Sequence, residues 1–209
     1  MGQKVSRLQP AVKPHKAATS KVRMPLKSLT SAPLVWIDVE TTGLEPEKDV
    51  MLEIAMVITD GNLDQLGPPQ SLVISQPPEQ LRKLNAWSKN CHTTSGLLDD
   101  VAKSSLTLQE AENMLMEQVT KYCKRPNKAI LAGNNVGFDR AFISRYMPVL
   151  SGYLHFRNID VSSVNELAKR WRPDVIGQYK KTYSHRALDD INESIRELKH
   201  YQDTIFRNS

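Results

Sequence analysis

Four carboxylates and one histidine, spread over three blocks of the sequence, are the side chains best suited to chemistry. Asp38 and Glu40 lie in LVWIDVETTGL, Asp139 in AGNNVGFDR, and His185 with Asp190 in SHRALDD. Carboxylate oxygens suit Mg²⁺ or Mn²⁺, and two such ions can stabilise the attacking and the leaving oxygen of a phosphodiester displacement. A histidine, whose pKa lies near neutrality, could take the proton of the attacking water. Together the blocks predict a two-metal phosphodiester hydrolase.

Each block alone has an ordinary structural explanation. Asp38 and Glu40 are two residues apart at the end of a predicted strand, so both leave the same face. Asp139 starts a predicted helix, where the helix dipole by itself favours an acid. Asp190 precedes an apolar residue and falls nearer the apolar stripe of the last helix than Asp189 does. We therefore expect Asp190 to face the protein and Asp189 to face solvent.

The elements that must position these residues follow a simple order: three β-rich runs come first, and strands then alternate with helices. We expect strands over residues 34–38, 50–59, 71–75, 128–132 and 155–160. We expect helices from the capping box Thr107–Glu110 to about Cys123, from about 138 to 146, from the capping box Ser163–Glu166 to Trp171, and over 186–205. Residues 172–183 read as a loop. This order predicts an α/β fold with a mixed sheet of three antiparallel strands followed by parallel ones, flanked by helices.

The charge of the chain is unevenly distributed. The net charge is +5, with 28 basic and 23 acidic residues, and seven of the basic residues precede Asp38, the first acid. The remaining 21 basic residues face 23 acids, a net charge of −2. We divide the chain into a basic leader over 1–32 and one domain over 33–207. A domain that gripped long nucleic acid would be clearly basic, so a short substrate is favoured.

The leader permits three interpretations. Its lack of acids, together with Arg, Lys and Ser, favours a mitochondrial targeting peptide; an inert tail comes second. MGQKVS also fits the N-myristoylation pattern at Gly2, which would give a cytoplasmic, lipid-anchored protein.

The longest apolar runs are too short to span a bilayer. Cys91 and Cys123 form no metal-ligand spacing and read as ordinary thiols.

The three blocks and the runs between them resemble the oligoribonuclease family, in the branch of the DEDD exonucleases with a histidine. The likeness covers about residues 33–207 and includes WIDVETTGL, LEIA, LTLQEAE, RYMP, LHFRNIDVS, ELAKRW and SHRALDDI, in the family's order. It implies an RNase H-like fold, a homodimer, and 3′→5′ hydrolysis of very short RNA, preferably dinucleotides, to nucleoside 5′-monophosphates. It implies two Mg²⁺ or Mn²⁺ ions held by Asp38, Glu40, Asp139 and Asp190, with His185 as general base.

The resemblance also implies substrate contacts. Leu44 and Trp87 match positions that pack on the terminal bases. A leucine wedged between the bases and a tryptophan ring stacked on one of them hold the bases without recognising which bases they are. In this family the LHFR strand of the partner subunit caps the 5′-phosphate. The matching positions near that phosphate are Asn135, Phe156, Arg157 and Ser162. The family usually has Tyr where Phe156 stands and Ser where Asn135 stands. Both differences argue against a strict dinucleotide preference.

Two alternatives stay open at this point. One is an exonuclease of the same branch that acts on DNA or on longer RNA 3′ ends. The motif VETTGL, which follows Asp38, favours this alternative. The other is a catalytically inactive nucleotide-binding scaffold. The intact set of Asp38, Glu40, Asp139, His185 and Asp190 argues against the scaffold.

Overall fold

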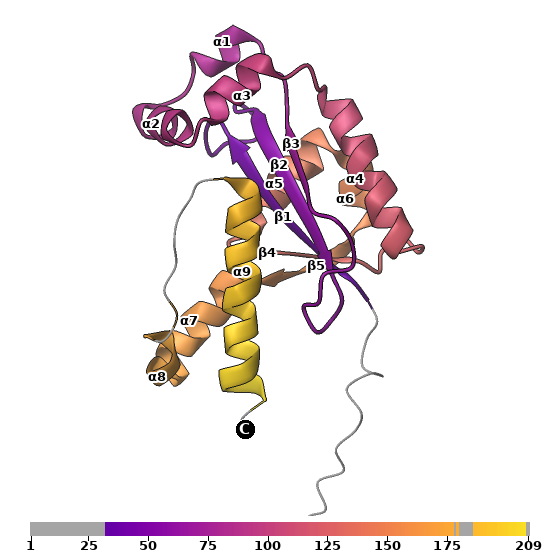
Figure 1. The fold of residues 1–209 in the computed structure, drawn as a ribbon, viewed down its shortest axis with the longest axis vertical. Helices are drawn as coiled ribbons and strands as arrows, with labels where there is room; N and C mark the ends of the chain where they lie inside the picture. Colours follow the sequence, from indigo (N-terminus) through magenta and orange to yellow (C-terminus); the bar gives the residue numbers. More distant parts are fainter. Residues whose placement is uncertain (1–31, 178, 180–185, 208–209) are drawn as a thin grey trace, which may run out of the picture.

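A five-stranded mixed sheet forms the centre of the molecule in the computed structural model, which describes residues 32–177, 179 and 186–207 (Figure 1). Its strands are β1 (Leu34–Thr41), β2 (Met51–Thr59), β3 (Gln70–Val73), β4 (Ile130–Gly133) and β5 (His155–Asp160). The strand order is β3-β2-β1-β4-β5. β1 pairs antiparallel with β2, as β2 does with β3, whereas β1–β4 and β4–β5 are parallel. The predicted mixed sheet is confirmed.

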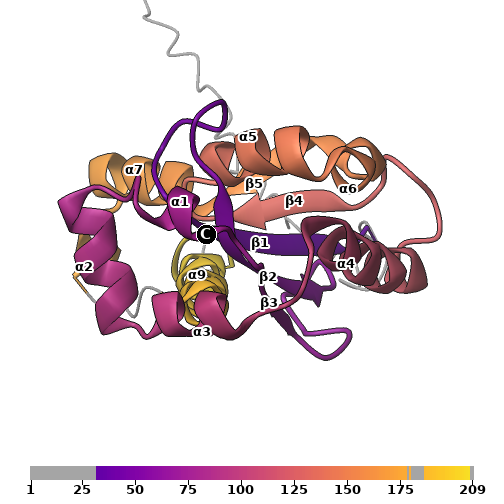
Figure 2. The ribbon, with the colours of Figure 1, turned by 90° about the horizontal axis from the view of Figure 1, so that it is seen from above.

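Helices cover both faces of this sheet (Figure 2). They are α1 (Pro78–Leu81), α2 (Ala86–Thr94), α3 (Leu97–Lys103), α4 (Leu108–Tyr122), α5 (Gly137–Tyr146), α6 (Pro148–Tyr153), α7 (Val161–Trp171), α8 (Pro173–Ile176) and α9 (Ala187–Tyr201). A π-helical turn, Gln202–Phe206, extends α9. Buried residues of α4, α5 and α6 share one core with the sheet, and those of α7 and α9 share a second; α3 packs on β2 in a third, smaller cluster. Within the described residues, no helix is long and apolar enough to cross a membrane.

The alternation of β1 explains why carboxylates gather at its end. Its odd-numbered side chains are buried in the core beneath α4–α6; they are Val35, Ile37 and Val39. Leu34 and Trp36 point to the opposite face, into the core with α7 and α9. Asp38 and Glu40 continue that second face, because side chains alternate along a strand. The strand runs to Thr41, three residues beyond the predicted end, so Glu40 as well as Asp38 lies within β1.

α9 crosses the second face of the sheet and contacts β1 and β2 (Figure 1). Ala187, Ile191 and Tyr201 are buried along its inner side. Asp189 is exposed and Asp190 is half-buried, as the position of the apolar stripe predicts. The first turn of α9 therefore presents Asp190 toward the sheet.

Several element predictions need correction. α7 begins two residues before the predicted capping box at Ser163: the carboxylate of Asp160 accepts the N–H of Ser162 at 2.9 Å and caps the helix. Asp160 ends β5, so one residue serves as both strand end and helix cap. α8 lies within the predicted loop 172–183. α8 is a single short turn that begins at Pro173. It has no apolar period, so the sequence pattern does not indicate a helix there.

Pro148 ends α5 and also begins α6, a helix that the sequence pattern does not predict. Proline fits the first position of a helix, where its missing N–H costs nothing. The buried Glu112 of α4 accepts the N–H groups of Val149 and Leu150 at 2.8 and 3.0 Å. The long-range contact from α4 thus completes a helix start that no local residue caps. α1, α2 and α3 are likewise unpredicted; the capping box at Thr107 and Glu110 before α4 is confirmed.

Candidate active site

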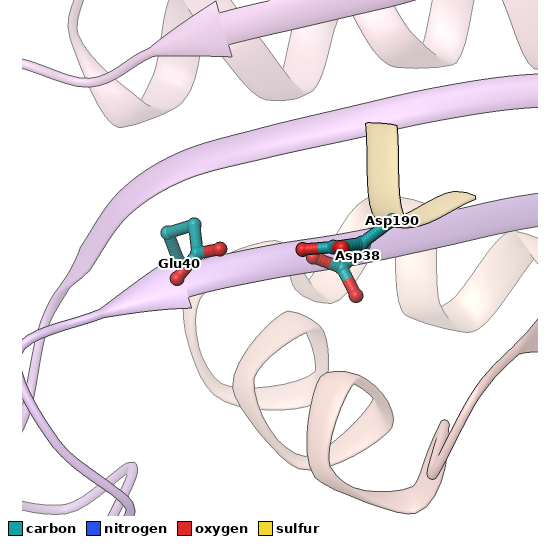
Figure 3. Close-up of side chains that lie close together, drawn as sticks. All are labelled: Asp38, Glu40 and Asp190. Carbon is teal, nitrogen blue, oxygen red and sulfur yellow. The ribbon is translucent and has the colours of Figure 1, made fainter. Parts of the chain in front are cut away.

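Three acids from two distant parts of the chain meet at the carboxyl end of β1 (Figure 3). One carboxylate oxygen each of Asp38, Glu40 and Asp190 lies within 4.8 Å of the others. β1 supplies the first two from one face, and α9 supplies the third. This spacing suits a shared divalent cation, because oxygen ligands surround Mg²⁺ or Mn²⁺ at about 2 Å.

Asp139 joins these acids from the other side of the sheet. Its side chain is 3% exposed, and its Oδ1 accepts the N–H of Val39 at 3.0 Å, which ties the first turn of α5 to β1. It lines the same cavity as the three acids, with a volume of about 220 Å³. The walls are completed by Asn134, Asn135 and Phe138 after β4, and by Glu193 and Ser194 of α9. The four predicted metal ligands therefore open onto one cavity.

The electrostatics of this cavity oppose full ionisation of its acids. Burial, followed by the negative charges of Asp190 and Glu53, raises the pKa of Glu40 from 4.5 to about 8. Burial also raises the pKa of Asp38 well above its ordinary value, and the charge of Asp139 adds to the effect. The pKa of Asp139 is raised chiefly by burial as well, although the N–H of Val39 partly offsets this. Divalent cations would relieve the repulsion, so the residues fit such ions.

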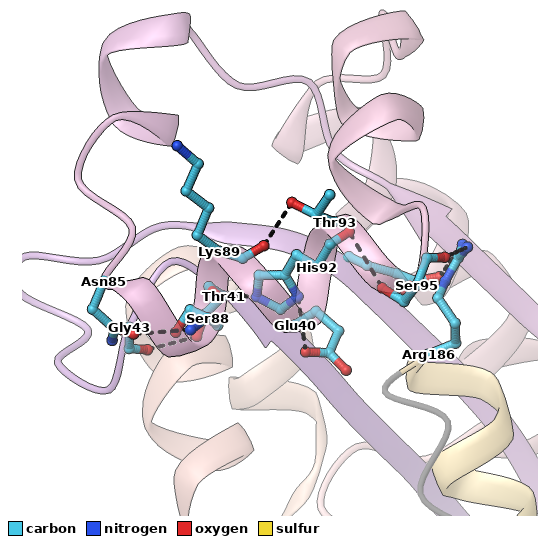
Figure 4. Close-up of polar contacts among 11 residues, drawn as sticks. Glu40, Thr41, Gly43, Asn85, Ser88, Lys89, His92, Thr93, Ser95 and Arg186 are labelled. Atoms are coloured by element: carbon cyan, nitrogen blue, oxygen red, sulfur yellow. Dashed lines mark hydrogen bonds and ion pairs between the residues drawn. The ribbon is translucent and has the colours of Figure 1, made fainter.

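His92 is a buried neighbour of the acids. Its Nε2 lies 2.9 Å from the carbonyl oxygen of Thr41, and its Nδ1 lies 3.8 Å from Glu40 (Figure 4). α2 presents it, and Asn85 caps this helix by accepting the N–H of Ser88. The imidazole thus braces the end of β1 at Thr41, the residue after Glu40.

Sequence reasoning from the residues alone missed two polar groups around the acids. Glu193 is 5% exposed and lines the cavity three residues after Asp190. The i, i+3 spacing on one helix was the available signal for it. His92 carries no comparable signal, because α2 has no clear apolar period.

The predicted substrate residues are spread more widely than the acids. Among them only Asn135 lines the cavity; its N–H donates to Asp160 at 3.0 Å, and its φ is 56°. Ser162 also bonds to Asp160, through its hydroxyl at 2.7 Å, and lines a neighbouring cavity that shares Asn134. Phe156 and Arg157 lie on the exposed edge strand β5, with the guanidinium 5.0 Å from the ring centre.

Leu44 and Trp87 stand on the surface outside the cavity lining, 78% and 67% exposed. The loop of Leu44 is held from within: the carboxylate of Asp49 accepts the Thr42 hydroxyl at 3.0 Å and the Glu45 N–H at 2.9 Å. The Tyr146 hydroxyl donates to the carbonyl of Asp49 at 2.6 Å. An exposed leucine on a braced loop is suited to contact with a ligand.

His185 lies outside the described residues, so its place relative to the acids stays a prediction. Most of the leader also lies outside the described residues. The described chain resumes at Arg186, directly before α9.

Comparisons with known proteins identify relatives of this chain. A family model described as an exonuclease of the RNase_T type matches residues 35–198. The oligoribonuclease of Marinobacter nauticus is 44% identical over 174 residues, which cover 83% of this chain and 96% of that protein. The oligoribonuclease of Vibrio vulnificus is 44% identical over 180 residues, covering 86% and 99%.

Solved structures support the fold. A zinc-bound complex of E. coli exonuclease I with single-stranded DNA superposes with a TM-score of 0.67 at 17% identity, over 85% of this chain and 42% of that one. A complex of E. coli exonuclease I with a dA16 oligonucleotide gives a TM-score of 0.65 at 18% identity, over 84% and 42%. This chain spans about two fifths of these exonuclease I chains. The likeness confirms the predicted RNase H-like exonuclease fold, and the full-length matches show that the chain belongs to the oligoribonuclease family.

Proposed function

We propose that this protein is a 3′→5′ exoribonuclease that degrades very short RNA, preferably dinucleotides, to nucleoside 5′-monophosphates. The observation that carries the proposal is the meeting of Asp38, Glu40, Asp139 and Asp190 on one cavity in a chain of the oligoribonuclease family. The reaction is hydrolysis: water adds to the terminal phosphodiester phosphorus, and the 3′-oxygen of the preceding nucleotide leaves with a proton.

Asp38, Glu40, Asp139 and Asp190 would hold two divalent cations, Mg²⁺ or Mn²⁺. Their donor atoms are all carboxylate oxygens, which favours these hard ions over zinc. When bound, the cations would supply the positive charge that stabilises the phosphate in the transition state and makes water a better nucleophile. Raised pKa values mark the same carboxylates as groups that ionise readily only when a cation is near.

We assign the general base to His185. The sequence supports this role, since the residue precedes α9 by two positions and Asp190 lies five residues further on. A neutral imidazole can accept a proton at physiological pH. Its test is a pH–rate profile, in which loss of His185 removes the limb that requires a deprotonated base.

We assign substrate binding to the exposed residues around the cavity. Leu44 would separate the two bases and Trp87 would stack on one of them, contributions of about 1–3 kcal/mol per base. Asn135, Arg157 and Ser162 would hold the 5′-phosphate. Phe156 would contact the 5′ nucleotide without the hydroxyl that family members usually have.

The exposed β5 edge supports a homodimer in this proposal. Phe156 is 77% exposed on a strand whose central residues all face solvent. Side chains placed so far outward can reach the cavity of a second copy. The measurement is the solution mass of the purified chain, with activity followed across the concentration range of dissociation.

A time course on 5′-labelled RNAs of two to seven nucleotides, with Mg²⁺ or with Mn²⁺, tests the function. We expect the dinucleotide to be cut fastest per site, and cleavage to stop in excess EDTA. Equal-length DNA and a long RNA serve as comparison substrates. Faster cutting of those per site would replace the proposed substrate with DNA or longer RNA 3′ ends.

For the leader we propose mitochondrial targeting, supported by its basic, acid-free composition. A fluorescent fusion of the full chain should colocalise with mitochondria. Substitution of Gly2 by Ala separates this from lipidation, because it abolishes N-myristoylation and leaves a targeting peptide intact.

A further inference from the structure

Arg186 sits directly before α9 and bonds to several elements at once. Its Nε and one terminal nitrogen donate to the two oxygens of Glu53, each at 3.2 Å. The other terminal nitrogen donates to Asp100 of α3 at 3.1 Å and to the carbonyl of Ser95 at 3.4 Å (Figure 4). Glu53 is 1% exposed and also accepts the Ser71 hydroxyl at 2.6 Å. A buried carboxylate is thus fully provided with hydrogen bonds.

The position of this pair links it to the acid cluster. Glu53 of β2 lies directly opposite Glu40 of β1 in the strand register, so both side chains leave the same face. Arg186 precedes Asp190 by one helical turn. The pair therefore joins the strand beside the first metal-ligating acids to the helix that carries the last one.

The same guanidinium also fixes the helices that brace β1. Asp100 and Ser95 belong to α3 and to the turn that joins it to α2. α2 carries His92, which contacts Thr41 and lies beside Glu40. Loss of Arg186 would release α9 and the α2–α3 unit, and would leave the charge of Glu53 unpaired opposite Glu40.

We propose that Arg186 is a positioning residue for the reaction: through Glu53 it sets Asp190 at the distance from Asp38 and Glu40 that lets them share cations. The proposal rests on the proposed function for its catalytic part. Displacements of about 1 Å at reacting groups can cost roughly a hundredfold in rate, and partners of metal ligands typically contribute about 10–100-fold to metal affinity. A purely structural ion pair would contribute to folding alone.

The test removes both charges together. Arg186→Met with Glu53→Gln leaves no buried unpaired charge, and the glutamine oxygen can still accept from Ser71. We expect a folded protein, an affinity for Mn²⁺ at least about tenfold weaker by titration calorimetry, and a kcat on a dinucleotide about a hundredfold lower with KM changed less than about threefold. Arg207→Met, which removes an exposed pair with Asp203, is the control and should keep both values.

The outcomes separate the alternatives. A folded double variant with Mn²⁺ affinity and kcat within about twofold of the parent overturns the proposal, since it assigns the pair to folding. If the double variant does not fold, Arg186→Lys decides by the same measurements: lysine keeps a charge but not the two-point contact, and unchanged values again overturn it. If the parent chain binds Mn²⁺ but cuts no RNA, the proposed function fails, while the difference in Mn²⁺ affinity still tests Arg186.

Discussion

The acid cluster is built in the opposite way from the substrate surface, which consists of the exposed residues Leu44, Trp87 and Phe156 that are proposed to contact substrate. Asp38, Glu40, Asp139 and Asp190 come from the core face of a central strand and from helices packed on it, and Asp139 is 3% exposed. Leu44, Trp87 and Phe156 are 78%, 67% and 77% exposed. The first region is assembled by folding, whereas the second presents apolar side chains to solvent.

This contrast separates two kinds of energetic cost. In the acid cluster, folding removes carboxylates from water and brings their negative charges together, and both effects cost free energy. The raised pKa of Glu40 reflects both. On the substrate surface the cost is exposed apolar area, which binding would bury at roughly 25 cal/mol per Å². Substitutions in the cluster should therefore change turnover and metal dependence, whereas substitutions on the surface should change substrate affinity.

The largest expected effect is the loss of one metal-ligating acid. Asp190→Asn should lower kcat by about a thousandfold or more, because it removes charge and a ligand at the cavity. Asp189→Asn is the matched control, since that neighbour is exposed on the same helix turn. It should keep kcat within about twofold.

Asp139→Ala should abolish Mg²⁺-dependent hydrolysis in the same way, and should leave the solution mass, measured by light scattering, unchanged. Equal activity in Asp139→Ala, or equal losses in the Asp189 and Asp190 variants, would contradict the separation between buried and exposed acids.

The pH dependence of the metal-free protein provides the next effect. The folded-state pKa of Glu40, about 8, lies above its ordinary value of 4.5. Between those values the folded chain keeps a proton that the unfolded chain has lost, so stability falls as pH rises through this window. We expect the Tm of the EDTA-treated protein to be lower by about 5 °C or more at pH 8.5 than at pH 6.

Added Mn²⁺ should restore Tm most strongly at pH 8.5, because cations bind the ionised carboxylates. The variant Asp190→Asn removes one repelling charge and should make the metal-free curve less steep. A metal-free Tm that rises between pH 6 and 8.5 would show that the acids do not crowd as the structure indicates.

A smaller effect should mark the substrate surface. Leu44→Ala should raise KM for a dinucleotide about tenfold with little change in kcat, because an exposed side chain loses only its contact with the bases. Leu66→Ala, another exposed leucine at 39%, should leave KM unchanged. If Leu44→Ala instead lowered kcat alone, Leu44 would determine how the substrate is positioned at the acids rather than how tightly it binds.

The sequence is informative about the acid cluster because local rules govern it. The i, i+2 spacing of Asp38 and Glu40 fixes their shared face, and the apolar stripe separates Asp190 from Asp189. Those rules also predicted the sheet and most helices that position the cluster. Long-range contacts were beyond them: Glu112 starts α6 from another helix, and Arg186 pairs with Glu53 across the fold.

The substrate surface is less readable from local pattern. Trp87 lies on α2. This helix has no clear apolar period, so its formation depends on tertiary packing rather than on a local sequence pattern. An exposed tryptophan has no local reason to be functional. Only the likeness to a family distinguishes Leu44 and Trp87 from other exposed apolar side chains.

The smallest expected effect concerns the hydroxyl missing at Phe156. Phe156→Tyr would add a donor on the exposed β5 edge, next to Arg157, where the 5′-phosphate is proposed to bind. One added hydrogen bond is worth about 0.5–1.5 kcal/mol, so KM for a 5′-phosphorylated dinucleotide should fall about threefold with kcat unchanged. A dinucleotide with a free 5′-hydroxyl is the matched substrate and should show no gain. An equal change for both substrates would mean that the ring, rather than a phosphate contact, determines the response, and would remove this residue from the phosphate site.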